Sequence, residues 1–248
     1  MMAYDLDTLT NPALQSSTDP GLRAFLGRVY LKLTGGLVLS AAIAWSVANV
    51  PALRDLFFQS ADGNIVGFTV WGGILVFSPL AVLFAASFLV RDHTARGAAW
   101  LYWTVAALVG SSLSLLALTY TGAALVSTFL ATAGAFAGLS LFGYVTRRNL
   151  AAFGSFLAVA LIGLIIAMVA NMFFKSPLAY LALNGIGVLI FAGLIAADTQ
   201  RLKKIYYATS DPEALDASAN YGALTLYLNF INLFELLLSF SGGRSRRS

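Results

Sequence analysis

Residues 97–146 read GAAWLYWTVAALVGSSLSLLALTYTGAALVSTFLATAGAFAGLSLFGYVT, fifty positions without one charged side chain. A transmembrane helix needs about 20 predominantly apolar residues, so this stretch is too long for a single crossing. At its centre lies the polar segment Thr119-Tyr120-Thr121-Gly122, which is typical of a tight turn. We therefore expect two transmembrane helices here, at 98–118 and 122–145.

Uncharged runs of similar character lie on both sides of this stretch. Hydrophobic residues make up 59% of the 248 positions and charged residues only 10%, whereas a soluble domain carries about 25% charged residues. A transmembrane β-barrel needs strands of about ten residues that alternate in polarity, so these uniformly apolar runs exclude it, and we expect no strands. The sequence predicts an all-α integral membrane protein in a lipid bilayer, with seven transmembrane helices at 30–50, 67–90, 98–118, 122–145, 151–174, 178–198 and 221–241.

The two ends of the chain differ from the spans in composition. The first 28 residues are polar and carry three aspartates, which is not the pattern of a cleaved signal peptide. We therefore expect an N-terminal tail at 1–28, one seven-helix domain at 29–241 and a basic C-terminal tail at 242–248.

Basic residues are divided unequally between the two sets of loops, and the side richer in lysine and arginine is usually the cytoplasmic one. One set holds only Arg54 and Lys175. The other holds ten basic residues, namely Arg23, Arg28, Lys32, Arg91, Arg96, Arg147, Arg148, Arg201, Lys203 and Lys204. The N-terminus is therefore predicted to be cytoplasmic. Seven spans then put the basic C-terminal tail outside, so either the tail is tolerated there or the last segment is re-entrant.

The inventory of reactive side chains is small. The chain has no cysteine and one histidine, His93, which excludes thiolate and multi-histidine metal sites. It also lacks a phosphate-binding loop and a Gly-rich dinucleotide motif. Its basic residues lie at span ends, where topology requires them, and do not indicate a nucleic-acid partner. We expect no enzyme activity and no cofactor.

Few polar side chains lie inside the apolar spans, where a carboxylate costs about 2.5–3.5 kcal/mol on insertion scales. Asp198 closes the sixth span, and Arg201 follows as its neighbour three residues later. Asn229, Asn232 and Glu235 recur at three-residue spacing in the seventh. Such a stripe favours protein or water over lipid, which indicates that the seventh helix lies inside the bundle. Two plainer interpretations stay open: Asp198 as an interfacial residue, and Glu235 as a neutral, protonated one.

Small residues in the spans predict where helices approach each other closely. Gly134 and Gly138 form a GxxxG pair in the fourth span, and Gly143 continues the same smooth face. We interpret these glycines as packing positions.

Two segments near the C-terminus are distinctive at their separation: Asp198-Thr199-Gln200, and the closing Leu226-Tyr227-Leu228-Asn229-Phe230-Ile231-Asn232-Leu233-Phe234. Other characteristic segments are Trp71, Ser78-Pro79-Leu80, 143–150, 163–171 and 191–196. Together they resemble the transmembrane Bax inhibitor motif family over residues 20–241. The resemblance implies a bacterial inner (plasma) membrane protein of seven helices, with the seventh at the centre of the bundle.

Members of this family are associated with a pH-sensitive calcium leak and, in eukaryotes, with protection from cell death. The resemblance implies a pH sensor, or gate, of two aspartates on the sixth and seventh helices, which cannot both ionise easily. Asp198 matches the first aspartate, whereas Asn229 occupies the place of the second. An amide removes the repulsion between like charges, so we expect a weaker or acid-shifted pH response.

Glu235 is the one substitute for the missing carboxylate on the same helix. It lies about 9 Å along the helix from Asn229, at 1.5 Å per residue, and with Asn232 it is a candidate for an ion pathway. The family also has a basic residue near the sensor. The candidates for it are Arg91, at the cytoplasmic end of the second span, and Arg201.

Two functions stay open. The first is a cation leak along the polar face of the seventh helix, with calcium ions as the permeant species implied by the resemblance, since calcium takes oxygen ligands. The second is a non-transporting regulator that binds a membrane partner, such as a membrane-anchored quality-control protease, through the tail at 1–28. Deletion of residues 1–20 separates them, because flux in liposomes should survive that deletion and partner control should not.

Overall fold

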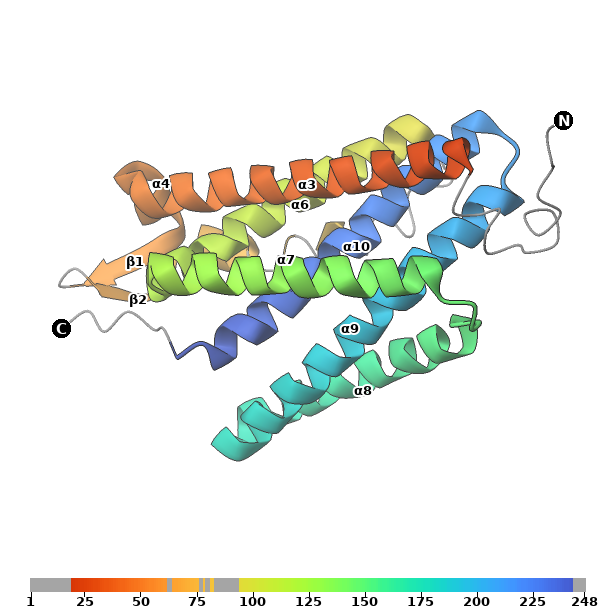
Figure 1. Ribbon diagram of the computed structural model, residues 1–248. Helices are drawn as coiled ribbons and strands as arrows, with labels where there is room; N and C mark the ends of the chain where they lie inside the picture. Colours follow the sequence, from red (N-terminus) through yellow and green to blue (C-terminus); the bar gives the residue numbers. More distant parts are fainter. Residues whose placement is uncertain (1–18, 62–63, 76–77, 79–80, 83–93, 243–248) are drawn as a thin grey trace, which may run out of the picture.

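The computed structural model describes residues 19–61, 64–75, 78, 81–82 and 94–242 (Figure 1). Within them, six helices are long and apolar enough to cross a membrane. They are α3 (Pro20–Asn49), α6 (Ala95–Thr119), α7 (Gly122–Val145), α8 (Ala151–Phe174), α9 (Pro177–Ala208) and α10 (Pro212–Phe240). The prediction of a helical membrane protein is confirmed. The predicted span at 67–90 lies mostly outside the described residues, although 70–75 are helical, so the count of seven stays a prediction.

Side-chain caps explain where most of these helices begin. The predicted break in the longest uncharged stretch is confirmed: α6 ends at Thr119, and the hydroxyl of Thr121 accepts a hydrogen bond from the Ala124 amide to begin α7. Such a cap satisfies a backbone donor that the helix itself leaves unpaired. The same type of cap is formed by Asp19 for α3, Thr94 for α6, Ser176 for α9 and Asp211 for α10.

The last two long helices extend beyond the predicted spans. α9 continues ten residues past Asp198 to Ala208, and α10 begins at Pro212, nine residues before the predicted start. Hydropathy indicates where a chain leaves the apolar layer, whereas a helix ends where its caps are. Asp198 therefore lies in the interior of α9. Its carboxylate is thus not at the C-terminus of the helix, where the helix dipole would repel a negative charge.

A short hairpin follows α3, so the expectation of no strands was wrong for this connection. After α4 (Pro51–Phe57), β1 (Phe58–Ala61) pairs antiparallel with β2 (Asn64–Phe68). The rings of Phe58 and Phe68 contact each other across the pair in a tilted arrangement, with centroids 5.6 Å apart. The argument against strands concerned the apolar spans, and aromatic cross-strand pairs are sufficient to favour a hairpin in a loop.

Among the long helices of the described bundle, α10 is the most buried. α10 packs against α3, α6, α7 and α9, whereas α8 packs mainly against α9. In an apolar stretch of 18 residues in each helix, 56% is buried in α10 and 11% in α8. In Figure 1, α10 runs obliquely through the bundle between the α3–α6 pair and the α7–α9 pair.

Most basic residues of the described part of the chain gather at one end of the bundle, whereas Arg54 and Lys175 lie toward the other (Figure 1). Arg28 pairs with Asp216 between α3 and α10, and Lys204 donates to Asn149 between α9 and the α7–α8 turn. Figure 1 shows the start of α3 at this end and the hairpin and the end of α10 at the other. α10 is one uninterrupted helix, about 44 Å long at 1.5 Å per residue. It therefore runs from one end of the described bundle to the other (Figure 1).

The glycine prediction was only partly right. A Cβ atom on Gly134 or Gly138 would meet no described atom within 4 Å, so neither glycine is at a close contact between the described helices. A Cβ on Gly143 would collide with the backbone of Ala196, so α7 and α9 approach each other closely at this glycine. The place where α7 crosses α9, rather than the GxxxG spacing in the sequence, determines at which position a small side chain is required for packing.

Candidate functional site

Asp198 and Asn229 meet in the middle of the α9–α10 interface. The Asn229 Nδ2 atom donates a hydrogen bond of 2.8 Å to the Asp198 Oδ2 atom. Asn229 is buried and Asp198 is half-buried. The two sequence-predicted residues lie 31 positions apart in the chain and are brought together by the packing of α9 against α10.

The two residues after Asp198 hold α9 in place against the other helices. Thr199 is fully buried, and its hydroxyl donates to the Ile195 carbonyl at 2.8 Å and lies 3.4 Å from the Ser140 hydroxyl of α7. Gln200 accepts from the Leu150 amide and donates to the Arg148 carbonyl, both at 2.8 Å. The three consecutive residues Asp198-Thr199-Gln200 therefore contact α10, α7 and the α7–α8 turn in that order.

α10 is held on the opposite side by a second polar contact. The hydroxyl of Tyr227 lies 2.7 Å from Ser40 Oγ of α3, and Ser40 is also 2.8 Å from the Ala106 carbonyl of α6. All three helices are therefore joined at one buried point. Sequence reasoning missed this contact, because a serine and a tyrosine in apolar spans give no signal that they share a partner.

Two cavities of about 460 Å³ each border Asp198. One lies between α9 and α10 and the other between α8 and α9, and Arg201 lines both. The remaining lining residues of the first reach Ile205 and Ala214, and those of the second reach Leu150 and Lys204. Both cavities therefore lie toward the basic end of the bundle.

The candidate basic partners differ in what the structure says of them. Arg201 is exposed and shares both cavities with Asp198, but among the described residues no ion pair within 4.0 Å joins the two. Arg91 lies outside the described residues, as does His93.

The polar stripe of α10 does not stay on one face. Asn232 is half-buried and donates to the Leu228 carbonyl of its own helix at 2.7 Å. Glu235 is exposed. At 100° per residue, the six positions from Asn229 to Glu235 turn the side chain by about 120°, so the two cannot face Asp198 together. Glu235 is therefore not brought to the Asp198–Asn229 contact.

The described part of the chain offers few side chains that could hold a metal ion. There, no group of three or more histidine, cysteine, aspartate or glutamate side chains is close enough to hold a metal ion. A cation near Asp198 would thus be attracted by one carboxylate and completed by amide, carbonyl and water oxygens.

Comparison with known proteins identifies the family of the chain. A family model described as Inhibitor of apoptosis-promoting Bax1 matches residues 22–246. The chain belongs to this Bax inhibitor family. The match includes the Asp198-Thr199-Gln200 segment and all six long helices except the first two residues of α3.

Similar members of the Bax inhibitor family occur in distant bacteria. An uncharacterized protein of Caulobacter vibrioides is 49% identical over 228 residues, covering 92% of this chain and 91% of the relative. Inner membrane protein YbhL of Escherichia coli is 39% identical over 226 residues, covering 90% and 93%. The uncharacterized protein RP147 of Rickettsia prowazekii is 38% identical over 237 residues, covering 96% and 97%. The similarity therefore extends over nearly the whole of each protein.

Proposed function

We propose that this protein is a cation leak pathway, for calcium ions, in a bacterial inner membrane. It has seven spans with the last helix at the centre, and the Asp198–Asn229 hydrogen bond is its gate. One observation carries the proposal: a half-buried carboxylate joins α9 to α10 and borders two cavities. Ionisable groups at membrane depth are costly, and they commonly mark ion or proton pathways.

The distribution of charge supports an entry from the basic end. Because the side of a membrane protein that is richer in lysine and arginine is usually cytoplasmic, we assign this end, and with it the N-terminus, to the cytoplasm. The two cavities beside Asp198 lie toward the same end, so a cation that enters them from the cytoplasm meets this carboxylate first. At 4 Å, the attraction between two unit charges is about 1 kcal/mol even in water.

The packing of α10 beyond Asn229 corresponds to a closed pathway. Phe230, Leu233 and Phe234 are buried there, and the ring of Phe230 contacts Phe129 and Phe136 of α7. An apolar constriction of this kind excludes hydrated ions. Opening therefore requires α10 to move relative to α7 and α9, and the hydrogen bond between Asp198 and Asn229 opposes that movement.

The amide at position 229 changes what pH can do to this gate. Asn229 can donate its Nδ2 hydrogen to a carboxylate, and its Oδ1 atom can accept from a protonated carboxylic acid. The α9–α10 contact therefore persists in either state of Asp198. A pair of carboxylates cannot keep the contact when both are ionised, because two negative charges repel. The flux of this protein should accordingly depend little on pH, or change only in the acidic range.

The proposal is tested by calcium flux into liposomes that contain the purified full chain. Asp198→Asn keeps a hydrogen-bonding side chain at the contact but removes the charge, so flux should fall at least about fivefold. Asp216→Asn is the matched control, because Asp216 lies in an exposed ion pair with Arg28. Flux in Asp198→Asn equal to that of the wild type would refute the proposed role of the carboxylate.

A further inference from the structure

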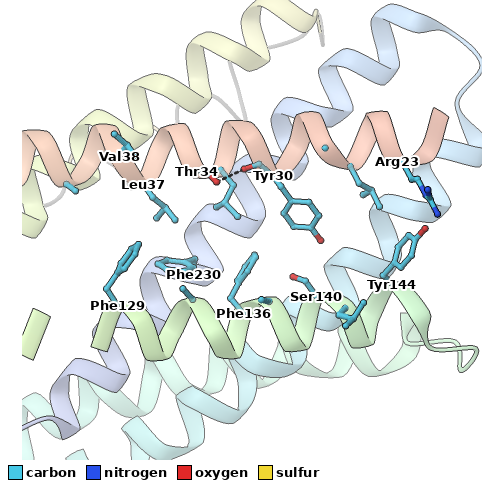
Figure 2. A pocket seen from close by; sticks show the side chains of 17 residues that line it. Arg23, Tyr30, Thr34, Leu37, Val38, Phe129, Phe136, Ser140, Tyr144 and Phe230 are labelled. Carbon is cyan, nitrogen blue, oxygen red and sulfur yellow. Dashed lines mark hydrogen bonds between the residues drawn. The ribbon is translucent and has the colours of Figure 1, made fainter. Parts of the chain in front are cut away.

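A groove of about 900 Å³ lies between α3 and α7, with Phe230 of α10 at its base (Figure 2). One wall runs along α3 from Arg23 to Ala41, and the other along α7 from Phe129 to Tyr144. At 1.5 Å per residue the α3 wall is about 27 Å long, close to the thickness of about 30 Å of a bilayer's hydrocarbon core. The groove is therefore long and narrow and follows the direction of the helices.

The polar groups of the groove are concentrated at one end. Figure 2 shows Arg23 and Tyr144 facing one another across this end, with Tyr30 and Ser140 next along the groove. Lys203 of α9 adds a second cation nearby, since its Nζ atom donates to the Tyr144 carbonyl at 3.3 Å and lies 5.4 Å from the Tyr144 ring centroid. This end of the groove is thus basic and rich in hydroxyl groups.

The other end of the groove is apolar. It is lined by Leu37 and Val38 of α3, by Phe129 of α7 and by Phe230 of α10. The one hydroxyl group between the two ends, that of Thr34, already donates to the Tyr30 carbonyl of its own helix. An apolar space of this kind offers no partners for water. Its natural occupant is a hydrocarbon chain.

We propose that this groove binds one anionic phospholipid from the leaflet on the Arg23 side. The acyl chain lies along the apolar part between α3 and α7, and the phosphate lies near Arg23 and Lys203. Charge complementarity selects an anionic headgroup over a zwitterionic one, because each lysine or arginine near a membrane surface contributes an attraction equivalent to about fivefold in affinity. The order of basic and apolar lining residues along the groove matches the order of head and tail in the lipid.

Native mass spectrometry of the detergent-solubilised full chain tests this proposal. The protein is titrated with phosphatidylglycerol and, separately, with phosphatidylcholine, and the bound fraction is read from the mass shift. Ala137→Phe fills the groove, and Ala135→Phe is its control, because Ala135 is exposed on α7 but does not line the groove. Arg23→Gln removes the cation, and Arg96→Gln removes an exposed arginine at the same end that does not line the groove.

We expect the wild type, Ala135→Phe and Arg96→Gln to retain one phosphatidylglycerol in preference to phosphatidylcholine. Ala137→Phe should bind at least about fivefold less of both lipids. In Arg23→Gln, the preference for phosphatidylglycerol over phosphatidylcholine should fall by about fivefold. Thermal unfolding of each variant shows that it is folded. The proposal would be overturned if Ala137→Phe and Ala135→Phe bound lipid equally. It would also be overturned if Arg23→Gln and Arg96→Gln lost the preference for phosphatidylglycerol equally, or if the wild type formed dimers without bound lipid.

Discussion

The Asn229 side chain donates a 2.8 Å hydrogen bond to the Asp198 carboxylate across the α9–α10 interface. Asp198 is thereby given a donor from a buried amide rather than from a second acid. The contact joins α10, the most buried helix of the described bundle, to α9. The two residues that follow Asp198 in α9 contact α7 and the α7–α8 turn. A change at this one contact therefore acts on how four helices are arranged.

Loss of the amide should destabilise the bundle moderately. Asn229→Leu keeps the branched shape of the side chain but leaves the carboxylate of Asp198 without this donor. Hydrogen bonds to charged groups contribute about 1.5–3 kcal/mol in soluble proteins, and those between membrane helices average about 0.6, so we expect a loss of about 1–2 kcal/mol. Thermal unfolding in detergent measures it. Asn232→Leu, whose amide bonds only within its own helix, should change stability less, and equal effects would contradict the assignment.

The buried hydroxyl contact between α3 and α10 should also contribute to stability. Tyr227→Phe removes the hydroxyl that lies 2.7 Å from Ser40 and should lower the free energy of unfolding by about 1 kcal/mol. The control is Tyr180→Phe, because Tyr180 is 50% exposed on α9. If both variants unfold at the wild-type temperature, the Ser40–Tyr227 contact does not hold α10 in the way described.

Two glycines of α7 should respond to the same substitution in opposite ways. In Gly143→Ala the new methyl group meets the Ala196 backbone of α9, with the Ala196 Cα atom 2.9 Å away, and overpacking of this kind costs about 1–3 kcal/mol. In Gly138→Ala nothing lies within 4 Å, and alanine is the better helix former by up to about 1 kcal/mol. Unfolding in detergent should rank Gly138→Ala above Gly143→Ala. The reverse order would contradict the close approach of α7 and α9.

The proposed orientation can be measured directly because the chain contains no cysteine. Gln59→Cys in β1 and Ser210→Cys between α9 and α10 each introduce a single, exposed thiol. A membrane-impermeant maleimide applied to intact spheroplasts should label position 59 and not position 210. After permeabilisation both should react, which controls for accessibility, whereas labelling of position 210 alone in intact cells would reverse the proposed topology.

Much of the fold follows from the sequence, because charge-free runs longer than a membrane crossing leave few alternatives. The break at Thr119–Gly122 is confirmed, and α7 and α8 have the predicted bounds. The ends of α9 and α10 differ because polar turns continue these helices beyond the apolar layer. The hairpin was missed because its residues lie between spans, where hydropathy carries no information on backbone conformation.

The candidate site could be predicted only in part. Asp198 and Asn229 are recognisable as polar groups in apolar spans, and the structure brings them into contact. Glu235 shares their three-residue spacing, but the helical rotation turns it to an exposed face. The partners of Thr199 and Gln200 depend on where the α7–α8 turn lies, which no local pattern reports. The groove between α3 and α7 likewise arises from the helix arrangement.

The measurement that tests the gate most directly is calcium flux in liposomes, from about pH 5 to about pH 8, for the wild type and for Asn229→Asp. The variant pairs two carboxylates that share a proton at low pH and repel when both ionise, by at least about 1 kcal/mol at 4 Å. Its contact therefore weakens as the pH rises, and flux should increase at least about fivefold across the range. The wild type should stay flat or change only in the acidic range.

Asn232→Asp is the matched control for this measurement, since it adds the same charge to α10 away from Asp198, and its profile should follow that of the wild type. A profile of Asn229→Asp that is identical to that of the wild type would contradict the assignment of the Asp198–Asn229 contact as the gate.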